Sequence, residues 1–152
     1  MNQRVLLQIV EGRLVLTSVI ECQHLRISRQ IMEFVIDTGS PNSYLSDKDV
    51  KRLQIPIKDR PSKEEVDFGG SRYKQVSLPE FKMYLLKEDK EKKESITLNL
   101  FLSALKTMKS SEKKIQMAQA LPSILGLDFL KNQKLSLHVI LTENIAYLEY
   151  KG

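Results

Sequence analysis

The sequence predicts an all-β fold with two or three short helices, because apolar residues recur at every second position between polar turns, the period of a half-buried strand. The clearest run is ITLNLFL, in which one face carries Ile96, Leu98, Leu100 and Leu102. Similar runs occupy about residues 3–10, 13–22, 30–36, 74–86, 135–141 and 145–150. So many short runs exclude a helical bundle.

Three segments indicate helices. Ser46 followed by Asp49 resembles a capping box and predicts a short helix from about 47 to 54, ending before Pro56. A second helix is expected at about 127–133, where Asp128 in the first turn suits the positive end of the helix dipole. A third, at about 110–119, rests on a weaker pattern.

Size and composition predict one globular domain, residues 1–152. The chain is 41% hydrophobic and 28% charged, which is enough for a core without a disulfide scaffold. The single cysteine, Cys22, cannot form an internal disulfide and is compatible with a reducing compartment. No apolar run reaches the roughly 18 residues that span a bilayer, and the first residues lack the layout of a secretory signal. We therefore expect a cytoplasmic protein without a membrane partner.

The basic surplus does not predict specific nucleic-acid binding. Lysine and arginine number 24 against 19 acidic residues, a net charge of +5. Sequence-specific binding would need that surplus in one stripe with groups that read bases, whereas residues 87–95 balance four lysines against four acids and predict a solvated turn. A local +3 comes from Lys106, Lys109, Lys113 and Lys114 against Glu112. Binding of an acidic polymer there remains an alternative hypothesis.

The segment MEFVIDTGSPNSYLS carries the most informative motif. An apolar strand delivers Asp37 into a Thr-Gly-Ser turn, where a desolvated carboxylate must be hydrogen-bonded, paired or protonated. Gly39 permits a turn conformation costly for other residues, and its backbone N–H is free to point at the carboxylate. Thr38 and Ser40 add hydroxyl donors nearby.

This motif and two others resemble a known family. IDTGS after an apolar strand resembles the active-site loop of aspartic peptidases. The segment LPSILGLDFLKNQKLSLHVILTENIAYLEY resembles the far end of the single-domain, retroviral-type members, in which two hydrophobic residues and a glycine precede a short helix and a closing hairpin; these three residues are here Ile124, Leu125 and Gly126. VDFGGSRY stands between the two, where the family has its glycine-containing flap. The chain is similar, over about residues 13–150, to retropepsin-like aspartic proteases.

The resemblance implies a fold and a site. It implies a closed, mostly antiparallel β-barrel, with a lysine-rich insertion at about 87–121. It assigns the catalytic role to Asp37, support of the active-site loop to Thr38, Gly39 and Ser40, and substrate binding by the flap to Phe68, Gly69 and Gly70. It implies no cofactor and no metal, and His24 and His138 have no companions at ligand spacing.

The resemblance also implies a homodimer. Its chemistry uses two carboxylates that share a proton, and Asp37 is the one aspartate of this sequence in such a turn. The second carboxylate would be Asp37 of another copy, on a two-fold axis. Because the family seals its dimer with terminal strands, the apolar segment from Ile145 to Tyr150 is expected at the interface. The substrate would be a peptide or an unfolded protein.

Other interpretations stay open. The chain could be a non-catalytic retropepsin-like module for dimerisation or peptide binding, and Asp37 could serve an ordinary turn. Gly69 and Gly70 also suit a plain hairpin. Cys22 with His24, two residues along the same strand face, is a poor candidate for a cysteine nucleophile.

Overall fold

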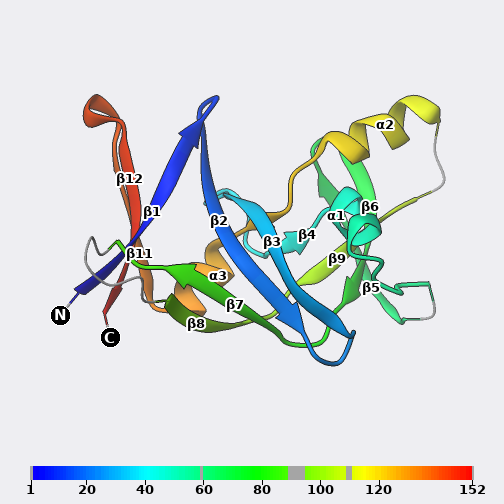
Figure 1. Cartoon of the computed structure of the whole chain (residues 1–152). Helices are drawn as coiled ribbons and strands as arrows, with labels where there is room; N and C mark the ends of the chain where they lie inside the picture. The colour runs from blue at the N-terminus through cyan, green and yellow to red at the C-terminus, as the bar shows by residue number, and fades with distance from the viewer. Residues whose placement is uncertain (1, 59, 89–94, 109–110, 152) are drawn as a thin grey trace.

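The computed structural model describes residues 2–58, 60–88, 95–108 and 111–151, which form a mostly antiparallel sheet and a few short helices (Figure 1). The strands are β1 (Asn2–Val10), β2 (Arg13–Cys22), β3 (Ile27–Ile36), β4 (Tyr44–Leu45), β5 (Ser62–Phe68), β6 (Ser71–Ser77), β7 (Phe81–Leu86), β8 (Ser95–Leu100), β9 (Ser103–Thr107), β10 (Ile124–Leu125), β11 (Leu135–Ile140) and β12 (Ile145–Lys151). The helices are α1 (Asp47–Arg52), α2 (Glu112–Ala120), α3 (Leu127–Asn132) and the 3₁₀ turn η1 (Leu141–Glu143).

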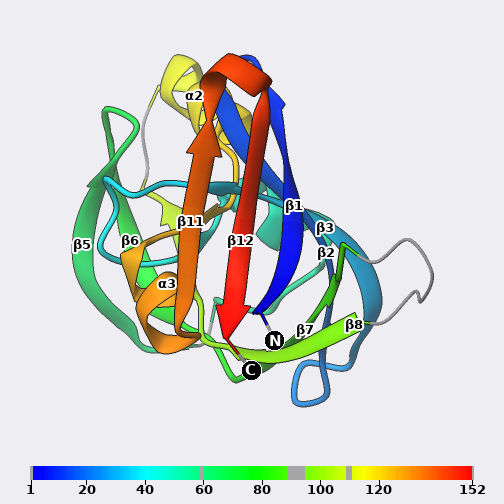
Figure 2. The same ribbon diagram turned by 90° about the vertical axis from the view of Figure 1, so that its left-hand side faces the viewer.

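The strands follow one path, in the order β11-β12-β1-β2-β3-β10-β4-β9-β6-β5, while β7 pairs with β2 and β8. The two ends of the chain lie close together, since β1 pairs antiparallel with β12. Figure 2 shows β11, β12 and β1 side by side on one face of the molecule. We call these three strands the terminal sheet.

The sheet does not close, so the expected closed barrel is not confirmed. β11 pairs with β12 alone among the described strands, and β5 with β6 alone, at opposite ends of the path. The β7–β8 hairpin adds to β2 and does not bridge those two ends. The all-β class with few short helices is confirmed.

The core lies between the sheet's curved layers. Its fully buried side chains include Leu16, Ile20, Phe34 and Phe81. The alternation in ITLNLFL holds, with Ile96, Leu98 and Leu100 buried on one face of β8 and Leu102 buried just beyond it. A second apolar cluster, which we call the flap cluster, contains Tyr44, Tyr73, Leu105, Ala118 and Ile124, with Val35, Val66, Phe68 and Leu121 packed against them.

The expected helices are present. Ser46 caps α1 by accepting a hydrogen bond from the Asp49 N–H at 3.3 Å, as the capping box predicts. α3 and α2 occupy the second and third predicted segments. The single strand predicted at about residues 74–86 is instead divided between two strands, β6 and β7. They are separated around Pro79, which has no N–H to donate to a neighbouring strand.

The lysine-rich insertion is structured in part. Its described residues form β8, β9 and α2, whereas 89–94 and Lys109 lie outside the described residues, so the predicted turn there stays a prediction. Within the described ranges no helix is long and apolar enough to cross a membrane.

Candidate active site

Asp37 stands at the end of β3, next to a strand from the far end of the chain. β3 pairs in parallel with β10, with Val35 opposite Ile124 and Ile36 opposite Leu125. The ladder continues to Asp37, whose N–H donates to the Leu125 carbonyl at 3.0 Å. β4 pairs with the other side of β10, so residues 37–43 form a loop that passes from one flank of β10 to the other. We call this segment the Asp37 loop.

The backbone around Asp37 orients its carboxylate. The Gly39 N–H donates to Asp37 Oδ1 at 2.9 Å, as the sequence predicts, and the Ser40 N–H donates to the Asp37 carbonyl at 3.1 Å. Asp37 is half-buried, and Thr38 and Gly39 are exposed. The expected strong desolvation is therefore not present in the single chain, because the Asp37 loop lies at its surface. The carboxylate is held in place and remains accessible.

Thr38 and Ser40 do not make the contacts, and Gly39 does not adopt the backbone conformation, that the sequence predicts. Gly39 is not among the described residues with left-handed backbone, so its conformation is open to other residues. A Cβ at this position would lie 3.2 Å from Asp37 Oδ1, so glycine leaves room beside the carboxylate. The Ser40 hydroxyl donates to the Asn42 carbonyl at 2.7 Å and not to Asp37. The exposed Thr38 side chain bonds to no other described residue.

Gly126 makes the closest approach to the Asp37 loop. A Cβ at Gly126 would lie 2.4 Å from the Ser40 carbonyl oxygen and 2.5 Å from that of Asn42. Its φ of −97° is open to any residue, so close backbone contact is the reason for glycine. The next residue, Leu127, donates its N–H to the Ser40 carbonyl at 2.9 Å. Close backbone packing thus accounts for the glycine before α3.

Asp128 and Ser43 form a polar brace that the sequence does not predict. Asp128 accepts hydrogen bonds from the Ser43 N–H at 3.1 Å and from the Ser43 hydroxyl at 2.6 Å. Ser43 Oγ in turn accepts from the Gly126 N–H at 2.9 Å, and the Asp128 N–H donates to the Pro41 carbonyl at 3.2 Å. Asp128 does lie in the first turn of α3, as predicted, but its partner is 85 residues away in the sequence, so no local pattern could reveal the pair.

β5 and β6 form the hairpin expected for the flap. Phe68 pairs with Ser71, which leaves Gly69 and Gly70 as a two-residue turn. Their φ angles are 58° and 80°, both in the left-handed region that glycine occupies at little cost. The geometry of the turn therefore accounts for both glycines, independently of what the hairpin binds.

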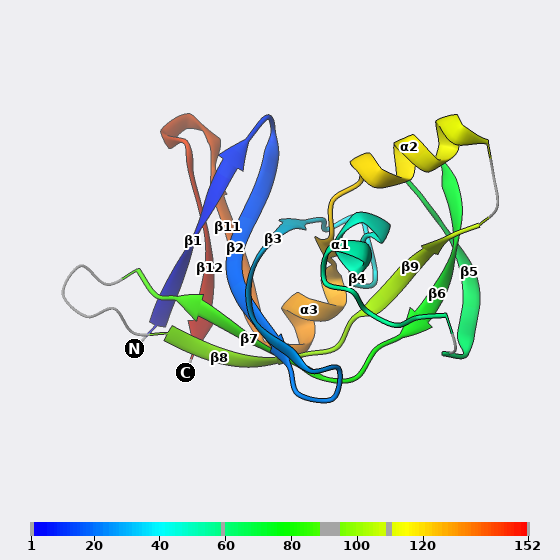
Figure 3. The ribbon, with the colours of Figure 1, turned by 45° about the vertical axis from the view of Figure 1, so that its right-hand side comes forward.

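The hairpin tip packs onto the segments that frame the Asp37 loop. The Phe68 ring lies 6.3 Å from the Tyr44 ring of β4, centroid to centroid. A Cβ at Gly69 would lie 2.7 Å from Leu121 Cδ2, just before β10. α2 lies over the ends of β5 and β6 (Figure 3), and its Ala118 is buried in the flap cluster. The structure thus brings together the flap tip and the strands that support Asp37.

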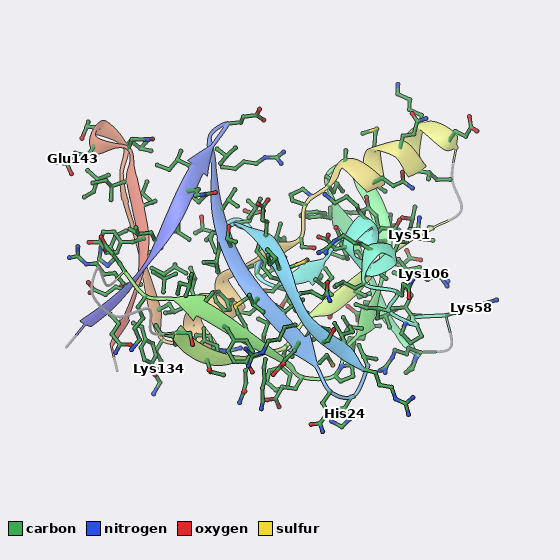
Figure 4. All side chains as sticks on the ribbon, viewed as in Figure 1. His24, Lys51, Lys58, Lys106, Lys134 and Glu143 are labelled. Carbon is green, nitrogen blue, oxygen red and sulfur yellow. The ribbon has the colours of Figure 1, made fainter. Side chains whose placement is uncertain are left out.

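The other candidate residues do not join this site. Cys22 is only 1% exposed and its thiol faces the Glu80 carbonyl, whereas His24 lies in the exposed turn after β2 (Figure 4), so no accessible Cys-His pair exists there. His138 stacks on Tyr147 in the terminal sheet, with ring centroids 4.7 Å apart. Over the described ranges, no three His, Cys, Asp or Glu side chains gather as metal ligands.

Comparison with known proteins identifies the fold. No model of a protein family and no curated protein matches the sequence. A solved structure, a retropepsin-like aspartic protease from Rickettsia conorii, matches 99% of this chain and 92% of its own with a TM-score of 0.58. The chain has a retropepsin-like fold. At 10% identity the similarity is one of fold, and the chemistry of this chain has to be argued from its own residues.

Proposed function

We propose that this chain is an aspartic endopeptidase that acts as a homodimer and hydrolyses peptide bonds with a water activated by two Asp37 carboxylates. The observation that carries the proposal is the position of Asp37: it is accessible, at the end of the half-buried strand β3, with Oδ1 held by the Gly39 N–H. The fold that presents it is similar to that of a retropepsin-like aspartic protease. No cofactor, metal, nucleic acid or membrane takes part in the proposal.

The chemistry follows from two carboxylates in contact. Like charges at such a distance resist joint ionisation, so the pair shares one proton and titrates in two macroscopic steps. The ionised Asp37 takes a proton from the water, and the protonated Asp37 donates to the carbonyl oxygen of the scissile amide. Asp37 Oδ2 accepts no hydrogen bond from the described residues, which leaves it free for the water or the second carboxylate. Gly39 and Ser40 hold the loop through their N–H groups, which donate to Asp37.

The terminal sheet supports a revised view of the dimer contact. β12 lies between β11 and β1, so its backbone is already paired on both sides, and its Ala146 and Leu148 face the core. The apolar character of this segment is thus explained in large part within one chain. Among the described strands β11 pairs with β12 alone and forms the open edge of the terminal sheet, and η1 at its end carries Leu141, which is 75% exposed. We infer that the second copy meets this edge and tip, because an unpaired strand edge readily accepts another strand.

The substrate in this proposal is an extended peptide or unfolded protein between the flap and the Asp37 loop. Backbone hydrogen bonds would supply affinity and pockets for alternate side chains would supply selectivity. Phe68, Gly69 and Gly70 would contact the peptide from the flap side. Because the tip packs against Tyr44 and Leu121, it must lift from them before a peptide enters.

The test is hydrolysis of an unfolded protein at mildly acid pH. Asp37→Asn should abolish cleavage while fold and dimer persist, because the amide cannot exchange the shared proton. Glu33→Gln, a change of the same kind at an exposed position of β3, should cleave normally. In an equal mixture of wild-type and Asn subunits that exchange freely, about a quarter of the dimers should be active.

Three results would count against the proposal. Cleavage by the Asn variant at the wild-type rate would place catalysis elsewhere. If the activity of the mixture falls only in proportion to the fraction of wild-type subunits, the site is not shared between subunits. Absence of cleavage by the wild-type dimer, or cleavage that a statine-type inhibitor does not block, would favour the non-catalytic module.

A further inference from the structure

Helix α1 begins with a capping box that a distant residue completes. Ser46 Oγ accepts a hydrogen bond from the Asp49 N–H at 3.3 Å, which is one half of the box. The other half would be a bond from the Ser46 N–H to the Asp49 carboxylate. Here Ser123 stands between the two groups: its Oγ accepts from the Ser46 N–H at 2.9 Å and donates to Asp49 Oδ2 at 2.6 Å. We call Ser46, Asp49 and Ser123 the α1 clamp.

The α1 clamp is a buried and charged contact. Ser46 and Ser123 are 1% exposed and Asp49 is 6% exposed. The second carboxylate oxygen, Asp49 Oδ1, lies 3.3 Å from Arg52 Nε, so both oxygens have partners. A buried carboxylate is costly unless its oxygens are bonded, and hydrogen bonds to a charged group are stronger than those between neutral groups. The start of α1 and the residue before β10 are therefore held together firmly.

The α1 clamp continues into the strand that supports Asp37. The Ser123 carbonyl accepts from the Val35 N–H at 3.0 Å, two residues before Asp37. The Leu125 carbonyl, two residues after Ser123, accepts from the Asp37 N–H at 3.0 Å. β10 is only two residues long, so a displacement of Ser123 reaches the bond to Asp37 with little chain to absorb it.

We propose that Asp49 is a positioning residue for Asp37: it holds Ser123, and through β10 it fixes the place where β3 presents the Asp37 carboxylate. The brace between Asp128 and Ser43 holds the chain after β10, and the α1 clamp holds the chain before it. The effect of Asp49 on hydrolysis rests on the proposed function, whereas its effect on the Asp37 backbone does not.

Asp47 provides the matched control. It lies two residues before Asp49 in the same helix and is equally buried, at 6% exposure. Its carboxylate pairs with Lys51 of α1, with Lys51 Nζ 2.9 Å from Asp47 Oδ2, and not with Ser123. Asp47→Ala therefore removes a buried carboxylate from α1 and leaves the α1 clamp intact.

The first test is hydrogen exchange of backbone amides, measured by NMR on the full-length protein. In Asp49→Ala the Val35 and Asp37 N–H groups should exchange at least about tenfold faster relative to that of Leu148, which is buried in the terminal sheet, because the lost contact frees β10. Asp47→Ala should leave this ratio unchanged. Asp49→Asn, which keeps an oxygen acceptor for the serine hydroxyl, should restore most of the protection.

Ser123→Ala tests whether Asp49 acts through Ser123. It should raise exchange at Val35 and Asp37 as Asp49→Ala does, and the double variant should be little worse than either single variant, because both remove the same contact. If Asp49→Ala does not fold, Ser123→Ala decides the outcome, since it removes only one hydroxyl group.

The second test is the rate of cleavage of an unfolded protein. If the wild type cleaves, Asp49→Ala should lower kcat about tenfold with KM nearly unchanged, because Asp49 acts on the position of Asp37 and not on the peptide. Asp47→Ala should keep both values. A wild type that does not cleave would reject the proposed function, and the exchange experiment would still decide the role of Asp49.

Four results would overturn the proposal. They are an exchange ratio in Asp49→Ala equal to that of the wild type, an equal rise in Asp47→Ala, full additivity of Asp49→Ala and Ser123→Ala, and an unchanged kcat in Asp49→Ala of an active enzyme.

Discussion

Replacement of Gly126 by alanine tests how the Asp37 loop is held. The added Cβ would lie 2.4 Å from the Ser40 oxygen and 2.5 Å from the Asn42 oxygen. Because Cβ atoms essentially never approach other heavy atoms within 3.0 Å, the loop would have to move by at least about 0.6 Å. The hydrogen bond from the Leu127 N–H to the Ser40 carbonyl would stretch with it.

The expected loss of stability in Gly126→Ala follows from these contacts. Overpacking against backbone that cannot rotate away costs about 1–3 kcal/mol, and a weakened buried hydrogen bond adds about 1 kcal/mol. We therefore expect Gly126→Ala to lower the free energy of unfolding by about 2–4 kcal/mol in urea titration. If the chain hydrolyses peptides, a shift of this size at Asp37 should reduce kcat/KM by roughly 100-fold.

Gly12→Ala provides the matched comparison. Gly12 has a φ of 77° and nothing lies within 4 Å of a Cβ there, so its cost is purely conformational, about 1 kcal/mol, and the Asp37 loop is untouched. A Gly126→Ala protein as stable as the wild type, within about 0.5 kcal/mol, would refute the close contact. A loss no larger than that of Gly12→Ala would refute the steric reasoning.

Further predictions concern the brace between Asp128 and Ser43, the flap cluster and the proposed dimer. Asp128→Ala should lower the unfolding free energy by about 2–3 kcal/mol in urea titration, because it leaves the Ser43 N–H and hydroxyl without their acceptor, while Asp128→Asn should lose less. Tyr73→Phe should leave stability unchanged or slightly higher, because the buried Tyr73 hydroxyl makes no hydrogen bond of normal geometry to any described residue. Burial raises the pKa of the Tyr73 phenol above its ordinary value of 10.0, so this phenol ionises at lower pH in the unfolded chain than in the folded one. The stability contributed by the neutral phenol should therefore be full below about pH 10 and fall as the pH rises further. Tyr73→Phe should reduce that fall in thermal unfolding. Leu141→Asp should shift sedimentation toward monomer at micromolar concentration, whereas an unchanged dimer would place the contact elsewhere.

The local patterns of the sequence were sufficient for most strands, the helix cap and the Asp37 turn. The alternation of Ile96, Leu98 and Leu100 predicts a half-buried strand because a strand has a period of two, and Ser46 with Asp49 marks a helix start because the cap bond spans three residues. The Gly39 N–H reaches Asp37 for the same reason, since donor and acceptor are two residues apart.

Contacts between distant parts of the chain were decided only by the tertiary structure. The sequence does not show which two carbonyl groups lie against Gly126, and nothing near Ser43 indicates that Asp128 is its acceptor. Likewise, the apolar pattern of β12 predicts a strand but not its neighbours, which are β11 on one side and β1 on the other. A period reports which face of an element is buried, whereas the choice of partner depends on how the whole chain packs, and that choice set both the open sheet and the support of Asp37.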